Sequence, residues 1–250
     1  MLEIDLNADV GEGVGDDLDL FHIVTTANVA AGGHAGGGAL LQSTIDSAVG
    51  MGIEVGAHPS YPDRPGFGRV SMADDLDHDG LLATIVDQIQ GVREACRRRG
   101  VDVTHIKAHG ALYNDAMRRP DIASVLMDAA QQTSVQRMMG LPGSALADAC
   151  DRHGLAFIRE AYADRGYEDD GSLTPRDQAG AVIDDVDVVT ERVVRMVRDR
   201  TVITRSGRVI DLEAQSVCVH GDTPGAVNLA RAIRAALEGQ GVSIRPMGRS

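Results

Sequence analysis

Lysine is nearly absent from this chain of 250 residues. Lys and Arg together number 24, Lys107 is the only lysine, and the other basic residues are all arginines. Arginine is larger, planar and permanently charged, whereas lysine is a compact ammonium whose pKa changes on burial. A site that needs a point charge or a proton carrier cannot exchange one for the other. The single lysine is therefore a candidate functional residue.

Aromatic residues and positive charge are also scarce. Trp is absent and aromatics make up 3% of the sequence, which leaves few stacking platforms for bases or sugars. The formal net charge of -13 argues against a nucleic-acid surface and favours a protein that binds small molecules.

No apolar run approaches the roughly 18 residues of a membrane span, and the first residues are acidic, unlike a signal peptide. We expect a cytoplasmic protein without nucleic-acid or membrane partners.

Cysteine is the third scarce residue. Cys96, Cys150 and Cys218 lie far apart and form no CxxC motif. Neither their number nor their spacing fits a disulfide framework. We expect reduced, mostly buried thiols and no catalytic cysteine.

Strand-like apolar runs alternate with amphipathic helical stretches along the whole chain. The predicted strands cover residues 2–9, 27–33, 53–59, 104–110, 137–141, 155–165 and 216–222. The predicted helices cover residues 17–24, 39–52, 81–100, 121–132, 144–154, 186–199 and 225–241. About seven βα units without a linker predict an α/β protein with one domain, residues 1–250, that forms a parallel barrel. Segment 201–212 is predicted to insert a small β-hairpin that turns at Ser206-Gly207.

Polar residues follow the predicted strands at their carboxyl ends. In a parallel barrel these ends meet at one face, so the side chains should converge on one cleft. They are Asp5, Asn7, Asp9, His34, His58, Lys107, His109, Glu160, Asp164, Arg165, His220 and Asp222.

Two of these groups alternate along a strand, so each group shares one face. Asp5, Asn7 and Asp9 predict an inward polar cluster in which a carboxylate orients an imidazole, holds a metal or acts as a base. The alternatives are a solvated edge or a helix cap. Lys107 could supply charge to an oxyanion or a phosphate oxygen while His109 moves a proton. The alternative for Lys107 is an ion pair with an acid inside the barrel.

Three loops complete the predicted cleft. The glycines around His34 suit an anion or substrate at a helix N-terminus, or only a tight turn, and the P-loop pattern is absent. The loop after His58 contains three prolines that would stiffen a rim, although an ordinary surface loop is the alternative. Segment 160–176 lacks the spacing of an EF-hand loop. Its polarity indicates either a mobile lid, in which Arg165 or Arg176 binds a carboxylate, or a solvated loop.

The histidine spacing does not by itself indicate a metal site. His34, His58, His109 and His220 with nearby carboxylates would supply enough ligands, but no HxxxH or HExxH motif places two on one element. The other histidines are expected on helices or on the opposite strand face, with structural or surface roles. They are His22, His78, His105 and His153.

Six motifs, in this order, carry a resemblance to a known family. They are IDLNADVGEG, ANVAAGGHAG, GAHPSYPDRPGFGR, IKAHGALYN, EAYADRGYEDDGSLTPR and VCVHGD. The chain resembles the LamB/YcsF family over nearly its whole length. The characterised function of that family is that of the A component of bacterial ATP-dependent 5-oxoprolinase, and its fold is a (β/α) barrel like that of glycoside hydrolases and deacetylases.

The resemblance implies hydrolysis of the lactam of 5-oxo-L-proline to L-glutamate. ATP, with Mg²⁺, would drive the reaction in a complex with partner subunits B and C. Activation makes chemical sense because an unstrained lactam is a poor electrophile. The hypothesised catalytic residues are Asp9 or His58 as general base, with Lys107 and His109 on the oxyanion or phosphate. The hypothesised substrate-binding residues are Asp5, Asn7, His34, Glu160, Asp164, Arg165, Arg176, His220 and Asp222. Replacing Lys107 with arginine would then leave folding intact and abolish turnover.

The sequence departs from the family motifs at four positions. Ala31, Gly33 and Gly37 stand where ACGFHAGD has Cys, Phe and Asp, and Ala108 replaces the proline of KPHGALYN. These departures leave open a paralogue that acts on another lactam or amide. Two other classes also stay open: a stand-alone, metal-dependent deacetylase-like hydrolase and a non-catalytic lactam-binding or assembly subunit.

Overall fold

The computed structural model of the chain describes residues 2–220 and 225–247, except for the side chain of His220. The strands are β1 (Glu3–Val10), β2 (Thr26–Ala30), β3 (Glu54–His58), β4 (Arg137–Gly140), β5 (Ala156–Tyr162), β6 (Thr201–Ile203), β7 (Val209–Asp211), β8 (Ser216–His220) and β9 (Ser243–Ile244). The helices are α1 (Asp17–Phe21), α2 (Gly38–Gly50), α3 (His78–Arg97), α4 (Gly110–Arg118), α5 (Pro120–Thr133), α6 (Ala145–His153), α7 (Val186–Arg198) and α8 (Ala226–Gly239). No helix in these ranges is long and apolar enough to cross a membrane.

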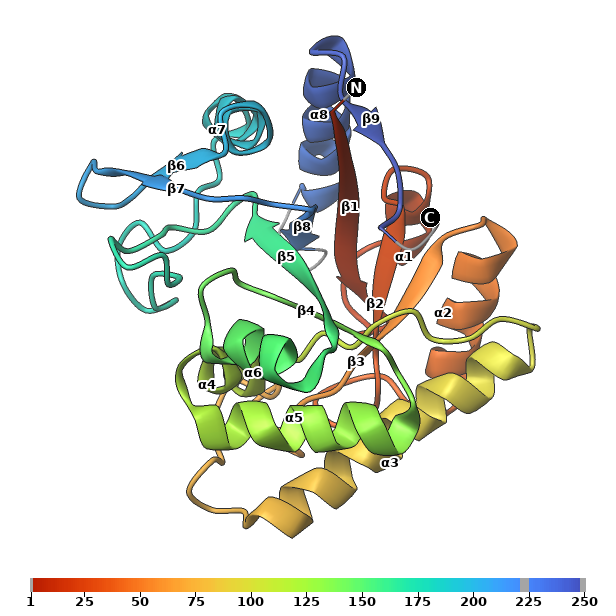
Figure 1. The fold of residues 1–250 in the computed structure, drawn as a ribbon. Helices are drawn as coiled ribbons and strands as arrows, with labels where there is room; N and C mark the ends of the chain where they lie inside the picture. Colours follow the sequence, from red (N-terminus) through yellow and green to blue (C-terminus); the bar gives the residue numbers. More distant parts are fainter. Residues whose placement is uncertain (1, 221–224, 248–250) are drawn as a thin grey trace.

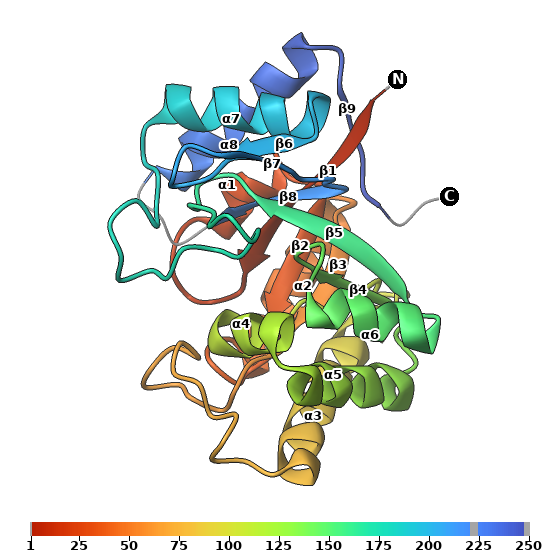
Figure 2. The ribbon, with the colours of Figure 1, turned by 60° about the vertical axis from the view of Figure 1, so that its left-hand side comes forward.

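The main sheet is parallel and curls into a barrel with helices outside it (Figures 1 and 2). Its strand order is β3-β2-β1-β8-β5-β4, and β9 pairs with the start of β1. Between β4 and β3, Ile106 forms parallel bridges to Met138 and Ala57, so the hydrogen-bonded ring continues through this segment. The predicted α/β barrel is confirmed.

The segment around Lys107 differs from its predicted strand. Ile106 alone forms bridges there, and helix α4, which the sequence analysis missed, begins at Gly110. Gly110 has φ +57° and lies so close to the backbone that a Cβ would be 2.4 Å from the Gly68 oxygen. Because only glycine tolerates both conditions, the chain turns sharply out of the barrel here.

Local sequence signals explain several other elements. Helix α6 begins where the Ser144 hydroxyl accepts a hydrogen bond from Ala147 N, and it ends at Gly154 with φ +66°. Strands β6 and β7 are antiparallel, with Gly207 at φ +88° between them. The predicted hairpin over 201–212 is thus confirmed.

The inside of the barrel is polar and the apolar core surrounds it. The even residues of β1, such as Leu6 and Ala8, are fully buried in the hydrophobic core. On the inner face Asp5 accepts hydrogen bonds from Thr25 (2.6 Å), Thr26 (2.7 Å) and Ser216. The predicted inward cluster is present: Ser216 connects Asp5 to Asn7, and Asn28 connects Asn7 to Asp9.

His105 belongs to this inner network, which corrects its predicted position on the opposite strand face. Its Nε2 lies 2.7 Å from Asn28 Oδ1, and Asn28 in turn donates to Asn7 and Asp9. Gly56 makes the room, because a Cβ there would lie 2.3 Å from His105 Nε2. The predicted structural role of His105 stands. His22 and His153 are exposed, and His78 pairs with Asp128 at the surface.

The cysteines are free and buried, as expected. Burial raises the pKa of the Cys96 thiol and of the Cys150 thiol to about 12. Neutral thiols are poor nucleophiles. Cys218 lies inside the barrel against Lys107.

Asp5 gives a testable pH dependence of stability. Burial raises its pKa from 3.8 to about 6, although the hydroxyl donors lower it. As the pH rises, the unfolded chain loses this proton before the folded chain does, so ionisation of Asp5 costs about 3 kcal/mol of stability by pH 7. In urea titrations from about pH 4 to pH 7, Asp5→Asn should therefore lose less stability than the natural chain. Parallel pH profiles would contradict this prediction.

Candidate active site

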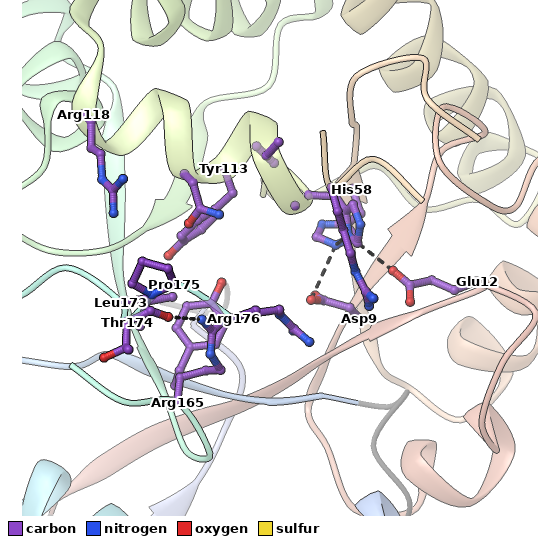
Figure 3. Close-up of a pocket in the computed structure, with 17 residues that line it drawn as sticks. Asp9, Glu12, His58, Tyr113, Arg118, Arg165, Leu173, Thr174, Pro175 and Arg176 are labelled. Carbon is purple, nitrogen blue, oxygen red and sulfur yellow. Dashed lines mark hydrogen bonds and ion pairs between the residues drawn. The ribbon is translucent and has the colours of Figure 1, made fainter. Parts of the chain in front are cut away.

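A cavity of about 280 Å³ opens at the carboxyl ends of the barrel strands (Figure 3). Segments that are far apart in the sequence build its walls. Its polar lining includes Asp9, Glu12, His58, Arg69, His109, Tyr113, Asn114, Arg118, Tyr162, Arg165, Thr174 and Arg176. Asp9, Glu12 and His58 stand together on one side, and Arg118 and residues 173–176 stand on the other (Figure 3). The sequence correctly predicted that strand ends converge on one cleft.

Lys107 lies beneath the cavity and is fully buried. Its Nζ is 2.7 Å from Glu160 Oε1 and 2.9 Å from Asp9 Oδ1. Burial alone would lower the pKa of Lys107, but the negative groups around it, led by Asp9, hold that pKa well above its usual value. The ammonium is therefore charged and compensates two carboxylates in the interior of the barrel.

This environment corrects the predicted contact between Lys107 and a reacting oxyanion. Lys107 is not among the residues that line the cavity. The ion pair inside the barrel, which was the alternative from sequence, is the arrangement found. Lys107 thus positions Asp9, which does reach the cavity. Compactness explains why an arginine does not stand here, since Cys218 Sγ at 3.2 Å and Asn7 Oδ1 at 3.3 Å also contact Nζ.

His58 and His109 hold their rings by hydrogen bonds to backbone carbonyls. His58 Nδ1 lies 2.8 Å from Lys107 O, and His109 Nε2 lies 3.0 Å from Phe67 O. A carbonyl only accepts hydrogen bonds, so those two nitrogens carry the protons. In the neutral rings the other nitrogens, His58 Nε2 and His109 Nδ1, present lone pairs 3.1 Å apart.

Two carboxylates border these lone pairs. Glu12 Oε1 lies 3.4 Å from His109 Nδ1, and Asp9 Oδ2 lies 3.5 Å from His58 Nε2. The ligand atoms of Glu12, His58 and His109 lie within 4.8 Å of one another, which is a spacing that could hold a metal ion. These groups could equally move a proton to or from a substrate.

His34 supports this cluster from behind. Its ring stacks on His109 with centroids 3.6 Å apart, and its Nε2 lies 2.9 Å from Glu12 Oε1. Burial, followed by the neighbouring His58, lowers the pKa of both His34 and His109 to about 3. His34 does not line the cavity, which corrects its predicted role as a substrate contact.

Guanidinium groups lie on both sides of the rim: Arg69 packs on Phe67 beside the histidines, and Arg118 and Arg176 lie across the cavity (Figure 3). Arg69, Arg118 and Arg176 are exposed and line the cavity. In a chain with a net charge of -13, this concentration of positive charge favours an anionic ligand. Arg176 lines the cavity, and its contact with a substrate carboxylate stays a prediction.

Arg165 is committed to the backbone of the loop that follows it. Its guanidinium donates to Thr174 O at 2.7 Å and to Ala181 O at 3.0 Å, and its side chain is buried. Burial, followed by the charge of Arg176, lowers the pKa of Arg165. Arg165 thus shapes the wall that presents Arg176, and since it also lines the cavity, its role as a carboxylate clamp stays a prediction.

Several other predicted substrate contacts lie below or beside the cavity. Asp5, Asn7, Glu160 and Asp164 are buried and are not among its lining residues, so a role for them in substrate binding stays a prediction. Glu160 holds both Lys107 and the hydroxyl of Tyr113, which donates to Oε2 at 3.1 Å. The side chain of His220 and all of Asp222 lie outside the described residues.

The sequence analysis missed Glu12, Arg69, Arg118, Tyr113 and Tyr162 as lining residues. Glu12 follows Asp9 within the first polar strand end, so extending that motif by three residues would have found it. Tyr113 and Arg118 could not be found without α4, which turns them toward the cavity. The rings of Tyr113 and Tyr162 meet edge to face at 5.7 Å and form the floor above Glu160.

Comparison with known proteins agrees with this architecture. A lactam utilization protein from Thermus thermophilus superimposes with a TM-score of 0.91 and 34% identity, covering 98% of this chain and 99% of that one. A family 4 carbohydrate esterase from Streptomyces lividans, in complex with acetate, gives a TM-score of 0.52 at 14% identity over 100% and 96% of the two chains. The second likeness shows a shared fold alone. The LamB/YcsF family matches residues 4–250, and this chain belongs to that family.

Proposed function

We propose that this chain hydrolyses the amide bond of a small anionic lactam, as the A component of an ATP-dependent 5-oxoprolinase. The observation that carries the proposal is the division of the cavity. Imidazoles and carboxylates occupy one wall and guanidinium groups occupy the rim. 5-Oxo-L-proline has one cyclic amide and one carboxylate, so its two ends match the two sides. The volume of about 280 Å³ suits so small a ring.

In this proposal His58 is the general base. Its Nε2 is held free of a proton by the bond from Nδ1 to Lys107 O, and it faces the cavity beside Asp9. It would take a proton from the water that attacks the lactam carbonyl. That proton would pass from His58 Nε2 to His109 Nδ1, 3.1 Å away, and from there to the leaving nitrogen. Asp9 would orient the His58 imidazolium that forms between the two proton transfers. The carboxylate of Asp9 is itself held in place by Lys107.

This proposal requires ATP and the partner subunits because the amide bond of the lactam ring is difficult to hydrolyse. An unstrained lactam is a poor electrophile, and transfer of the γ-phosphoryl group of ATP to its oxygen, with release of ADP, would make the amide carbon a stronger electrophile. We assign this step to subunits B and C, with ATP and Mg²⁺, and the ring opening to this chain. Attack of water and departure of the ring nitrogen would then leave an acyl phosphate, and a second water would release phosphate and L-glutamate. The arginine rim would suit a phosphorylated lactam as well as a carboxylate, because guanidinium binds both groups.

The direct test is glutamate release from 5-oxo-L-proline. The purified chain is assayed alone and with subunits B and C, each with and without ATP. We expect glutamate only in the complete mixture with ATP. Activity of the chain alone would favour the stand-alone amide hydrolase, and binding without turnover in any mixture would favour a non-catalytic role. Turnover of a different lactam would indicate a paralogue.

One departure from the family motif has a structural account. A Cβ on Gly33 would lie 2.4 Å from Ser60 Oγ and 2.5 Å from Gln88 Oε1. Gln88 accepts from Ser60 N and donates to Ser60 O, so it fills this position beside His34. Ala108 lines the cavity itself and is the departure most able to alter which lactam fits.

Arg176 should contribute to substrate binding more than to the chemical step. Removing one charge-assisted hydrogen bond to a carboxylate costs about 1.5 to 3 kcal/mol. We therefore expect Arg176→Ala to raise KM for 5-oxo-L-proline by about 10- to 100-fold, with a smaller change in kcat. The matched control is Arg245→Ala, at an exposed arginine next to β9 that does not line the cavity. An unchanged KM in Arg176→Ala would show that the carboxylate binds elsewhere.

A further inference from the structure

The cluster of Glu12, His58 and His109 has an unusual distribution of protons. Both imidazoles donate their accessible N–H to carbonyl oxygens, of Lys107 and Phe67 respectively. Each neutral ring therefore has only an acceptor left, and the two acceptors face each other at 3.1 Å. Two facing lone pairs repel unless a positive species, a proton or a metal ion, lies against both of them.

The third member of the cluster is also an acceptor. Glu12 Oε1 lies 3.4 Å from His109 Nδ1, and its side chain is only 7% exposed. A carboxylate oxygen and two ring lone pairs thus point into one small volume. This composition, with two nitrogens and one oxygen, is typical of a catalytic zinc site with an open position.

Two of the three separations between these atoms match a coordination shell, and the third, between Glu12 and His58, is within 4.8 Å. Ligand atoms about 2.0 to 2.1 Å from a tetrahedral ion are about 3.3 to 3.4 Å apart. The observed 3.1 Å and 3.4 Å fall close to that value. A proton shared by His58 and His109 would account for the first distance as well, with Glu12 paired to that charge, and the metal titration below distinguishes the two arrangements.

The surroundings also have the form expected of metal ligands. Histidine ligands commonly donate their second N–H to a carbonyl or carboxylate, which orients the ring, and both rings do so here. Glu12 is oriented in turn by His34, whose Nε2 lies 2.9 Å from Oε1. All three candidate ligands line the cavity, so an ion held there would be open to water and substrate.

We propose that Glu12, His58 and His109 form a binding site for one divalent transition-metal ion of the zinc class. His34 is a positioning residue for Glu12, and Asp9, with Oδ2 3.5 Å from His58 Nε2, borders the site. The ion would lower the pKa of a bound water, and that water would supply the base in place of His58 Nε2, because a nitrogen that binds the ion has no lone pair left for a proton. Binding of the ion does not depend on the identity of the substrate.

The test is metal binding by the full chain without a purification tag or substrate. After dialysis against a chelator, Zn²⁺ is titrated by calorimetry and Co²⁺ by its visible absorption. We expect one ion per chain and a Co²⁺ spectrum of low coordination number with nitrogen ligands. Glu12→Gln and His109→Ala should each weaken Zn²⁺ binding by at least about 10- to 100-fold, and the double variant should abolish it.

The control is His78→Ala, which removes an exposed histidine paired with Asp128 and should bind Zn²⁺ like the natural chain. Glu12→Gln keeps the shape of the side chain, so retained thermal unfolding would show that its effect is not a loss of folding. Absence of stoichiometric binding in the natural chain would overturn the proposal. Equal binding by the natural chain and the double variant would also overturn it, because the ion would then lie elsewhere. Neither result would bear on glutamate release by the complete complex, which tests the proposed function separately.

Discussion

Replacement of Lys107 with methionine is expected to lower the free energy of unfolding by about 3 to 5 kcal/mol. The ammonium is fully buried between Asp9 and Glu160, at 2.9 and 2.7 Å. Methionine has a similar length but no charge, so it would leave two carboxylates facing each other in the protein interior. Urea or guanidinium denaturation near neutral pH measures the effect.

A second substitution separates charge from packing. In Lys107→Met/Glu160→Gln, one of the two uncompensated charges is gone, so the double variant should recover part of the stability that Lys107→Met loses. Glu160→Gln alone provides the reference for the cycle. If Lys107→Met loses less than about 1 kcal/mol, the ion pair does not hold the barrel interior together.

The structure also revises the expected result for Lys107→Arg. The sequence alone suggested that arginine would leave folding intact. Nζ contacts Cys218 and Asn7 as well as the carboxylates, which leaves no room for a guanidinium. Overpacking of a buried site typically costs about 1 to 3 kcal/mol. We therefore expect Lys107→Arg to be less stable than the natural chain, with lost turnover that follows from a displaced Asp9.

His58→Asn should lower turnover by about 10²- to 10⁴-fold while the chain stays folded. The asparagine amide can take the place of Nδ1–H and still donate to Lys107 O, which His58 reaches at 2.8 Å. It has no counterpart of Nε2, so the basic lone pair that faces Asp9 and His109 is removed. Single-turnover glutamate release in the complete mixture with ATP measures the loss.

The matched control for this variant is His78→Asn, at an exposed position beside Asp128. Its turnover should equal that of the natural chain. Thermal unfolding of both variants distinguishes a lost base from a lost fold. Turnover that survives in a folded His58→Asn would assign the general base to Asp9 or Glu12, and it would contradict the role given to His58.

The sequence predicted the barrel because its signals are local and repeated. Apolar strands followed by polar ends recur along the chain, and the hairpin over 201–212 has its own glycine turn. Helix α4 was not predicted: the strand was expected to end at residue 110 and the next helix to begin at 121, so the residues of α4 were left unassigned. The reason for the break at Gly110 is a contact with Gly68, about 40 residues earlier in the chain, which no local pattern contains.

The site was predictable in outline but not in its division of roles. Asp9, His58 and His109 were predicted to share a cleft, and they do. The predicted contact of Lys107 with a reacting oxyanion was wrong. A charged side chain near a strand end can face the cavity or turn into the protein, and the choice depends on partners from other segments, such as Glu160 for Lys107.

The sequence by itself determined the order of strands and helices, the polar inner face of β1 and the family of the chain, because each depends on residue type and spacing. The tertiary structure alone decided which polar groups reach the cavity and which compensate one another beneath it. It also decided that His58, His109 and Glu12 present their lone pairs to one point. The physical reason is that proton positions and ion pairs are set by neighbours within about 3 Å, and here those neighbours come from distant parts of the chain.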